Sequence, residues 1–170
     1  DVWPDVSDTA LLETLELWLK PFMASAVKRR SWRGFVPDEA LRALLSYDDQ
    51  RRLESLLPEA VTVPSGRRVL VDYQQQSSPV IRVKLQEMFG LNELPVLING
   101  EVVLQAHLLS PGRRPIAVTS DLAGFWRNGY VQVRKELRGR YPKHPWPENP
   151  HTAPASAHVK ASSKASVKKK

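Results

Sequence analysis

Eight basic residues between positions 113 and 143 are the strongest chemical feature of the sequence. Three of them, Arg127, Arg134 and Arg138, are spaced seven and four residues apart, which places them on one side of a helix. Arginine suits two-pronged contacts with phosphate, and clustered Lys and Arg indicate nucleic-acid binding. The candidate nucleic-acid-binding residues are Arg113, Arg114, Arg127, Arg134, Lys135, Arg138, Arg140 and Lys143.

Two aromatic residues, Tyr141 and Trp146, follow this basic segment. Aromatic rings stack on the bases of single strands, so they suit the same function. The prolines at 142, 145 and 147 exclude a helix here and favour an extended strap. The rings can then anchor the strap to a core instead, and we favour this anchoring role.

The charge of the chain is unevenly distributed. Residues 1–112 contain 12 Lys or Arg and 15 Asp or Glu. Residues 113–144 contain eight Lys or Arg and two Asp or Glu. Residues 151–170 add five lysines and no acid, and the whole chain has a net charge of +7. This skew indicates an anionic partner for the C-terminal third. A solvated face with a solubilising tail is the alternative.

The sequence contains no recognisable catalytic or nucleotide-binding motif. Gly124 and Gly129 have the spacing of a phosphate-binding loop, but Tyr130 and Val131 follow where Lys and Ser or Thr are required. Both glycines lie inside a helical pattern, so close packing explains them better. We therefore expect no catalytic residue and no cofactor site in this chain.

The four histidines lack the spacing of metal ligands, so no metal site is expected. We interpret His107 as a core side chain with a hydrogen-bond partner, and His144 as a packing residue or a phosphate contact. The chain has no Cys, which excludes disulfides and favours a cytoplasmic setting. No apolar run approaches the about 20 residues of a bilayer span. We expect no membrane partner, and a monomer rather than an oligomer.

A helix is expected to carry the basic stripe. Thr119, Ser120 or Asp121 can cap its start, and Gly139 is expected to end it. Trp126 lies in the middle of its apolar face and is expected to be the central buried residue. The apolar face consists of Leu122, Phe125, Trp126, Tyr130, Val133 and Leu137.

The chain is expected to have an α+β fold in three parts. We expect a small helical unit with a leucine core over residues 1–60. In this unit, Pro21 ends or kinks the first helix. Residues 61–150 predict a β-rich domain with the C-terminal helix and the strap. Residues 151–170 contain almost no core-forming residues and predict a disordered basic tail.

The β-rich part shows alternating apolar residues in short runs. Asn99-Gly100 between two apolar runs predicts a hairpin. We expect five or six mostly antiparallel strands, in a curled sheet or an OB-like barrel closed by the C-terminal helix. The strand order cannot be read from the sequence.

Several runs resemble a known family. They are DLAGFW from Asp121 and RGRYPKHPWPENP from Arg138, and the runs LLSPGRRPIAVTSD, LPVLING and VPSGRRVLVDY fit the same domain. Over about residues 1–150 the chain resembles the C-terminal domain of the HrpB family of bacterial DEAH/RHA-type ATP-dependent RNA helicases.

This resemblance implies a part of a longer enzyme. The family carries its ATPase motifs in two RecA-like domains that this chain does not contain, so ATP and magnesium are expected in the parent alone. It further implies an accessory domain beside the helicase core, which binds nucleic acid, RNA rather than DNA, through its basic face. The alternative is a structural or protein-docking domain whose basic face meets an acidic partner surface.

Overall fold

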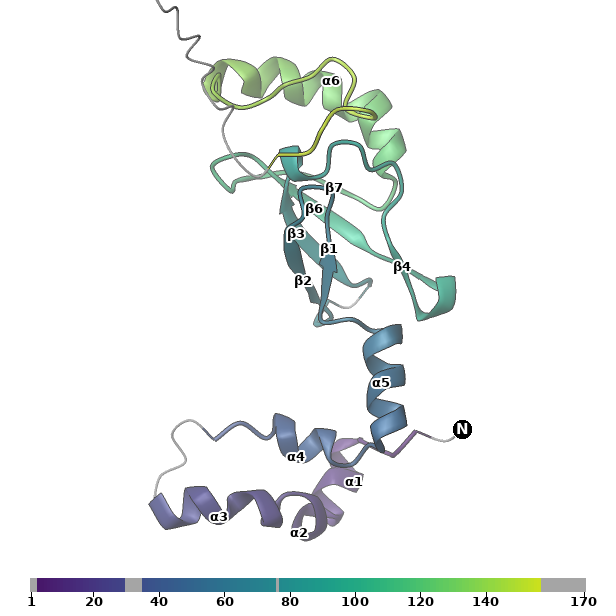
Figure 1. The fold of residues 1–170 in the computed structure, drawn as a ribbon, viewed down its shortest axis with the longest axis vertical. Helices are drawn as coiled ribbons and strands as arrows, with labels where there is room; N and C mark the ends of the chain where they lie inside the picture. The colour runs from purple at the N-terminus through teal and green to yellow at the C-terminus, as the bar shows by residue number, and fades with distance from the viewer. Residues whose placement is uncertain (1–2, 30–34, 76, 157–170) are drawn as a thin grey trace, which may run out of the picture. The chain divides into compact units, whose positions relative to one another are not determined.

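The computed structural model describes residues 3–29, 35–75 and 77–156 (Figure 1). The chain divides into two compact units, residues 1–55 (unit 1) and 56–170 (unit 2). The division comes slightly before the predicted boundary at residue 60, because Leu57 already packs against the core of unit 2.

Unit 1 is helical, as the sequence predicts. Its elements are α1 (Asp8–Glu13), α2 (Leu15–Trp18), α3 (Lys20–Arg29), α4 (Asp38–Arg42) and α5 (Tyr47–Leu56). The Ser7 hydroxyl accepts from the Ala10 N–H and so caps α1. α2 ends at Trp18 and α3 begins at Lys20, so the break expected near Pro21 is present, and Pro21 itself lies in the first turn of α3. Proline is tolerated there because the N–H groups of a first turn lack helical partners in any case.

Five strands of unit 2 form one mixed sheet with the order β1-β2-β3-β6-β7. The strands are β1 (Ala60–Thr62), β2 (Arg68–Asp72), β3 (Val80–Lys84), β6 (Gln105–Leu109) and β7 (Pro115–Thr119). All neighbours are antiparallel except β3 and β6, which run parallel. Parallel neighbours need a long connection, and the chain between Lys84 and Gln105 supplies it.

That connection contains a short 3-10 helix, η1 (Leu85–Glu87), and the predicted hairpin. The hairpin pairs β4 (Val96–Leu97) with β5 (Val102–Val103) around Asn99-Gly100 and is confirmed. Asn99 and Gly100 both have positive φ, which suits these two residue types.

The predicted α+β fold with a mostly antiparallel sheet is confirmed. In the described part of the chain, β1 and β7 are the two edges of the five-stranded sheet, and no pairing between them closes a barrel. The parallel pairing of β3 with β6 was not predicted, because register between distant strands depends on tertiary contacts rather than on alternation.

The C-terminal helix, α6 (Leu122–Arg140), lies across one end of the sheet (Figure 1). Asp121 caps it by accepting from the Gly124 N–H at 2.8 Å. Trp126 is 2% exposed, and its indole N–H donates to the Leu91 carbonyl at 2.7 Å, so its predicted burial is confirmed. Gly139 does not end the helix, which continues to Arg140. The Tyr141 N–H caps the end by donating to the Leu137 carbonyl.

The glycines of α6 have the packing role that the sequence favoured. A Cβ on Gly124 would collide with the carboxylate of its cap, Asp121. A Cβ on Gly129 would lie 2.7 Å from the Phe125 ring. Neither position leaves room for a phosphate-binding loop.

The predicted tail, 151–170, begins with an ordered stretch. The Gly90 N–H donates to the Pro150 carbonyl and the Ser156 N–H donates to the Gln86 carbonyl, both at 2.9 Å. The composition argument missed this stretch because backbone hydrogen bonds hold it. The residues after Ser156 lie outside the described part of the chain.

None of the helices in the described residues is long and apolar enough to cross a membrane.

Candidate nucleic-acid interface

The strap after α6 is held in place by hydrogen bonds. The indole N–H of Trp146 donates to the Tyr141 carbonyl, and the Tyr130 hydroxyl donates to the Pro147 carbonyl, both at 2.9 Å. Burial raises the pKa of Tyr130 far above its usual value, so its hydroxyl keeps the proton that it donates. Trp146 also packs against the core. The predicted role as an anchor to the core is therefore confirmed for Trp146, whereas Tyr141 is not part of the core cluster.

Arg134 belongs to this anchor rather than to a free basic stripe. Its Nε donates to the Trp146 carbonyl at 2.9 Å, and one terminal nitrogen lies 3.3 Å from a carboxylate oxygen of Glu148. Its side chain is 27% exposed. The spacing argument placed Arg134 on the correct helix face. That face adjoins the strap, whose Trp146 carbonyl and Glu148 carboxylate bind the guanidinium.

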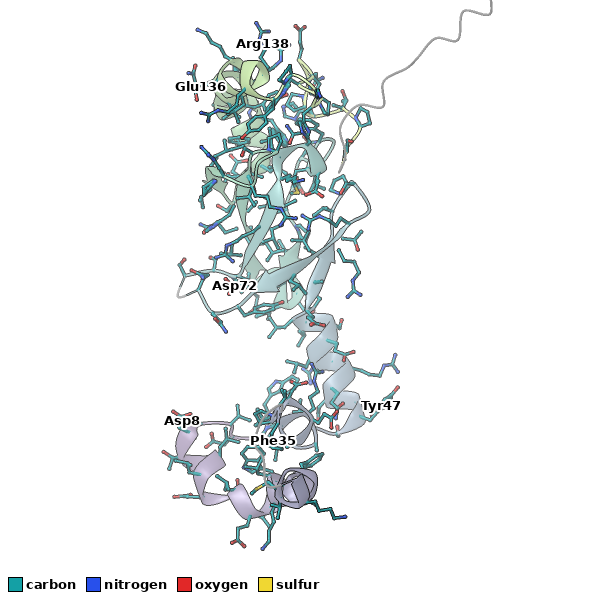
Figure 2. The ribbon with its side chains drawn as sticks, turned by 90° about the vertical axis from the view of Figure 1, so that its left-hand side faces the viewer. Asp8, Phe35, Tyr47, Asp72, Glu136 and Arg138 are labelled. Atoms are coloured by element: carbon teal, nitrogen blue, oxygen red, sulfur yellow. The ribbon has the colours of Figure 1, made fainter. Side chains whose placement is uncertain are left out.

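The other cations of α6 remain available to a ligand. Arg127, Lys135 and Arg138 are exposed and make no ion pair with any residue in the described ranges. Arg138 extends away from the rest of unit 2, with Glu136 nearby on the same helix (Figure 2). Three of the predicted binding residues thus form an exposed set on α6.

The remaining predicted residues lie where the parallel strands β3 and β6 end. Parallel strands end at the same edge of a sheet, and here Lys84 pairs with Leu109. The chain then makes the tight turn 110–114, in which the Ser110 N–H donates to the Arg114 carbonyl at 2.8 Å. Arg113 and Arg114 are exposed on this turn.

Tyr141 brings the C-terminal end of α6 to the same edge. A Cβ on Gly112 would lie 2.8 Å from the Tyr141 hydroxyl oxygen, so the ring rests against the turn. This contact places Arg140 and Lys143 beside the turn that carries the two arginines. We call the cations of these three segments the basic corner. It comprises Lys84, Arg113, Arg114, Arg140 and Lys143.

His144 connects the strap to Lys84. The backbone N–H of His144 donates to the Tyr141 carbonyl at 3.1 Å, and the imidazole ring packs edge to face against the Tyr141 ring. Partial burial and, secondly, the ammonium charge of Lys84 lower the pKa of His144 below 6.5. His144 is therefore mostly neutral at neutral pH in an otherwise cationic surrounding.

Comparison with known proteins identifies the family. The family described as ATP-dependent helicase C-terminal (HrpB_C) matches residues 18–150. The chain belongs to the HrpB family. This HrpB C-terminal domain is 44% identical over 153 residues to the ATP-dependent RNA helicase HrpB of Escherichia coli K12. The match covers 89% of the chain and 19% of that protein, so the domain spans about a fifth of its relative.

Two solved structures resemble the HrpB domain. The crystal structure of the E. coli DExH-box NTPase HrpB matches with a TM-score of 0.84 and 42% identity, over 92% of this chain and 19% of that one. The crystal structure of the E. coli DEAH/RHA helicase HrpB matches with a TM-score of 0.69 and 42% identity. That match covers 86% of this chain and 18% of the other. The resemblance drawn from the sequence runs is confirmed.

The histidines of the HrpB domain do not gather. His107 is half-buried and lies outside the core cluster, so the expectation of a core side chain is wrong. Its Nε2 does have a partner, Gln105 Oε1 at 3.3 Å. His151 Nδ1 lies 2.6 Å from Asn92 Oδ1. Among the residues with described positions, no three His, Cys, Asp or Glu side chains come close enough to hold a metal ion.

Sequence reasoning missed Lys84 as a member of the candidate site. It lies at the end of an alternating strand and carries no motif. Only the pairing of β3 with β6 and the fold-back of the strap bring it to His144. Its position at the end of that strand is the signal available in the sequence.

Proposed function

We propose that this HrpB C-terminal domain binds RNA through the basic corner and the exposed cations of α6. The observation that carries the proposal is the convergence of unpaired cations from β3, the turn 110–114 and the end of α6. RNA is chosen as the ligand because the relative from E. coli is named an RNA helicase.

The contacts are directed at the phosphate backbone. Arginine and lysine bind phosphate oxygens and release condensed counterions, which makes affinity steeply dependent on salt. Trp146 packs against the core, and the Tyr141 ring lies against Gly112 and His144, so neither ring is offered as a stacking platform. We therefore expect binding that depends little on base sequence.

Charge is separated along unit 2 in a way that favours this face. Asp72 lies at the end of unit 2 remote from Arg138 (Figure 2), where it pairs with Arg82 at 2.8 Å. The hydrogen bond from Arg82 lowers the pKa of Asp72, so this carboxylate stays charged and neutralises the arginine. Among the residues that the structure describes, the cations around α6 have no such carboxylate partner apart from Arg134.

ATP hydrolysis is assigned to other parts of the full-length protein. The domain supplies no lysine at a phosphate-binding loop, and we expect the isolated chain to fold without metal or nucleotide and to show no ATPase activity. Its role is to hold the RNA strand beside the ATPase domains of the same polypeptide. RNA-stimulated ATP hydrolysis by the pure chain would contradict this assignment.

The test is RNA binding across a salt series for the wild type and for Arg113→Ala/Arg114→Ala. Each lost phosphate contact reduces the slope of log affinity against log salt concentration by about one. The slope of the double variant should therefore be smaller by about two, and the variant should bind RNA more weakly at low salt. The matched control is Lys20→Ala/Arg68→Ala, which removes the same charge from exposed positions elsewhere. Equal losses in both double variants would indicate non-specific attraction only.

A second comparison separates binding from anchoring. Arg127→Ala/Arg138→Ala should reduce affinity and slope without a change in stability. Arg134→Ala should instead lower stability, because the Trp146 carbonyl and Glu148 lose their partner. If the wild type binds no RNA but binds an acidic protein surface, the domain is a docking module.

A further inference from the structure

We propose that Lys84 and His144 form a proton-linked phosphate subsite within the basic corner, so that RNA binds more tightly as the pH falls. This inference rests on the proposed RNA-binding function. It adds two residues from distant parts of the chain and a pH dependence that a surface of Lys and Arg alone would not have.

Lys84 is available to a phosphate because the nearest acid is already occupied. Glu87 is buried, with its side chain 3% exposed, and forms a two-pronged ion pair with Arg67 at 2.6 and 2.8 Å. The same carboxylate also accepts the backbone N–H of Lys84 at 3.1 Å. The ammonium of Lys84 makes no ion pair within the described ranges, so no acid there neutralises its charge, which acts on His144.

His144 is held firmly enough to act as a directed contact. The strap turn fixes its backbone to the Tyr141 carbonyl, and the Tyr141 ring packs against its imidazole. Tyr141 in turn rests on Gly112, so the imidazole belongs to a surface built from three segments.

Lys84 is the charged group whose field acts on His144. The elements that meet near the strap carry further charges, of which Glu87 on η1 is neutralised by Arg67 and Glu148 on the strap by Arg134. The charged groups on these elements are Lys84, Glu87, Arg113, Arg114, Arg138, Arg140, Lys143 and Glu148.

The direction of the effect follows from this surrounding. In the free protein, burial and Lys84 keep the pKa of His144 below 6.5, so the imidazole is mostly neutral at neutral pH. A bound phosphate supplies the missing negative charge, which stabilises the imidazolium and raises that pKa in the complex. Binding therefore takes up a proton. Between the free and bound pKa values, affinity rises by at most about tenfold for each unit of separation.

The experiment measures binding of a short oligouridylate by the full 170-residue chain from about pH 8 to pH 5 at constant ionic strength. Uracil and the phosphodiester do not titrate in this range, so the protein alone supplies the dependence. The wild type should bind more tightly at low pH. The affinity of His144→Gln should equal that of the wild type at about pH 8 and should not change as the pH falls.

The matched control is His107→Gln. His107 is a half-buried histidine of β6 whose hydrogen-bond partner is Gln105. It should keep the wild-type profile. A flat wild-type profile, or a His144→Gln profile as steep as the wild type, overturns the subsite. Absence of RNA binding at every pH overturns the proposed function itself.

NMR titration of the imidazole protons supplies an independent readout. Oligouridylate should raise the pKa of His144 in the wild type. Lys84→Met should raise the pKa of His144 in the free protein, because the ammonium that lowers it is gone, and should reduce the salt slope of binding by about one. An unchanged pKa of His144 on adding RNA that does bind would place the phosphate elsewhere and overturn the subsite.

Discussion

Unit 1 and unit 2 bury their apolar side chains to different extents. In the described part of unit 1, Ala40 is the one fully buried apolar residue, and Leu12 and Leu17 are 69% and 79% exposed. In unit 2, sixteen buried residues from the sheet, the connection between β3 and β6, and α6 form one cluster. The expectation that the leucines of unit 1 form a core is wrong for Leu12, because helical spacing identifies a face without identifying what covers it.

The difference shows what each kind of element needs. Short helices form from local caps and spacing, and they can do so with a thin core. A mixed sheet with a parallel pair forms only if distant strands meet, and the buried cluster holds them together. The basic corner depends on that second kind of organisation, so its geometry should be sensitive to mutations inside unit 2 and indifferent to those in unit 1.

The largest expected effect is the loss of Trp126. Trp126→Ala removes a ring packed against Phe89, Phe125 and Tyr130 and leaves the Leu91 carbonyl without its donor. Unit 2 should lose about 3–5 kcal/mol in denaturant unfolding. Trp3→Ala, at a 40% exposed position of unit 1, is the control and should cost much less. A cost below about 1 kcal/mol for Trp126→Ala would contradict the contrast between the units.

The next effect tests the contact that builds the corner. Gly112→Ala would force a Cβ to within 2.8 Å of the Tyr141 hydroxyl oxygen, so the ring or the turn must move. We expect a loss of about 1–3 kcal/mol together with weaker RNA binding. Gly139→Ala is the matched control, because nothing lies within 4 Å of its Cβ. That change should stabilise α6 by up to about 1 kcal/mol. Equal responses of the two variants would show that Tyr141 does not hold the turn.

A smaller effect is expected in unit 1. Leu17→Ser replaces a side chain that is 79% exposed, so the free energy of unfolding of the isolated chain should change by about 0.5 kcal/mol or less. Leu108→Ala, at a fully buried position of β6, should cost about 2–5 kcal/mol in the same assay. A large loss for Leu17→Ser would mean that unit 1 is packed more completely than the structure shows.

The smallest effect is a dependence of stability on pH. Because the pKa of His144 is lower in the folded protein than its ordinary 6.5, the unfolded state binds more protons as the pH falls through this value. Unit 2 should therefore lose a little stability below that pH, and His144→Gln should remove this part of the slope. Unfolding curves at several pH values check it, and a slope that persists in His144→Gln would assign it to other groups.

Much of the local structure could be predicted. The capped start of α6, the burial of Trp126 and the hairpin at Asn99-Gly100 all follow from short-range chemistry, although the sequence left Asp121 as one of three candidate caps. The end of α6 was misplaced by one residue, because glycine permits a helix end without requiring it. The aromatic strap was recognised as an anchor because proline prevents a helix and leaves the rings free to fold back.

The candidate site could be predicted only in part. The clustering of charge, with helical spacing for three of them, named the eight basic residues, since charge and period are properties of the chain itself. Which of them remain available depends on contacts over long separations, such as the bond from Arg134 to the strap and the contact of Tyr141 with Gly112. The sequence by itself determined the family, the helix faces and the position of the positive charge. Only the tertiary structure decided that Arg134 is an anchor and that Lys84 joins the basic corner, because strand register and the fold-back of the strap depend on packing between residues far apart in the chain.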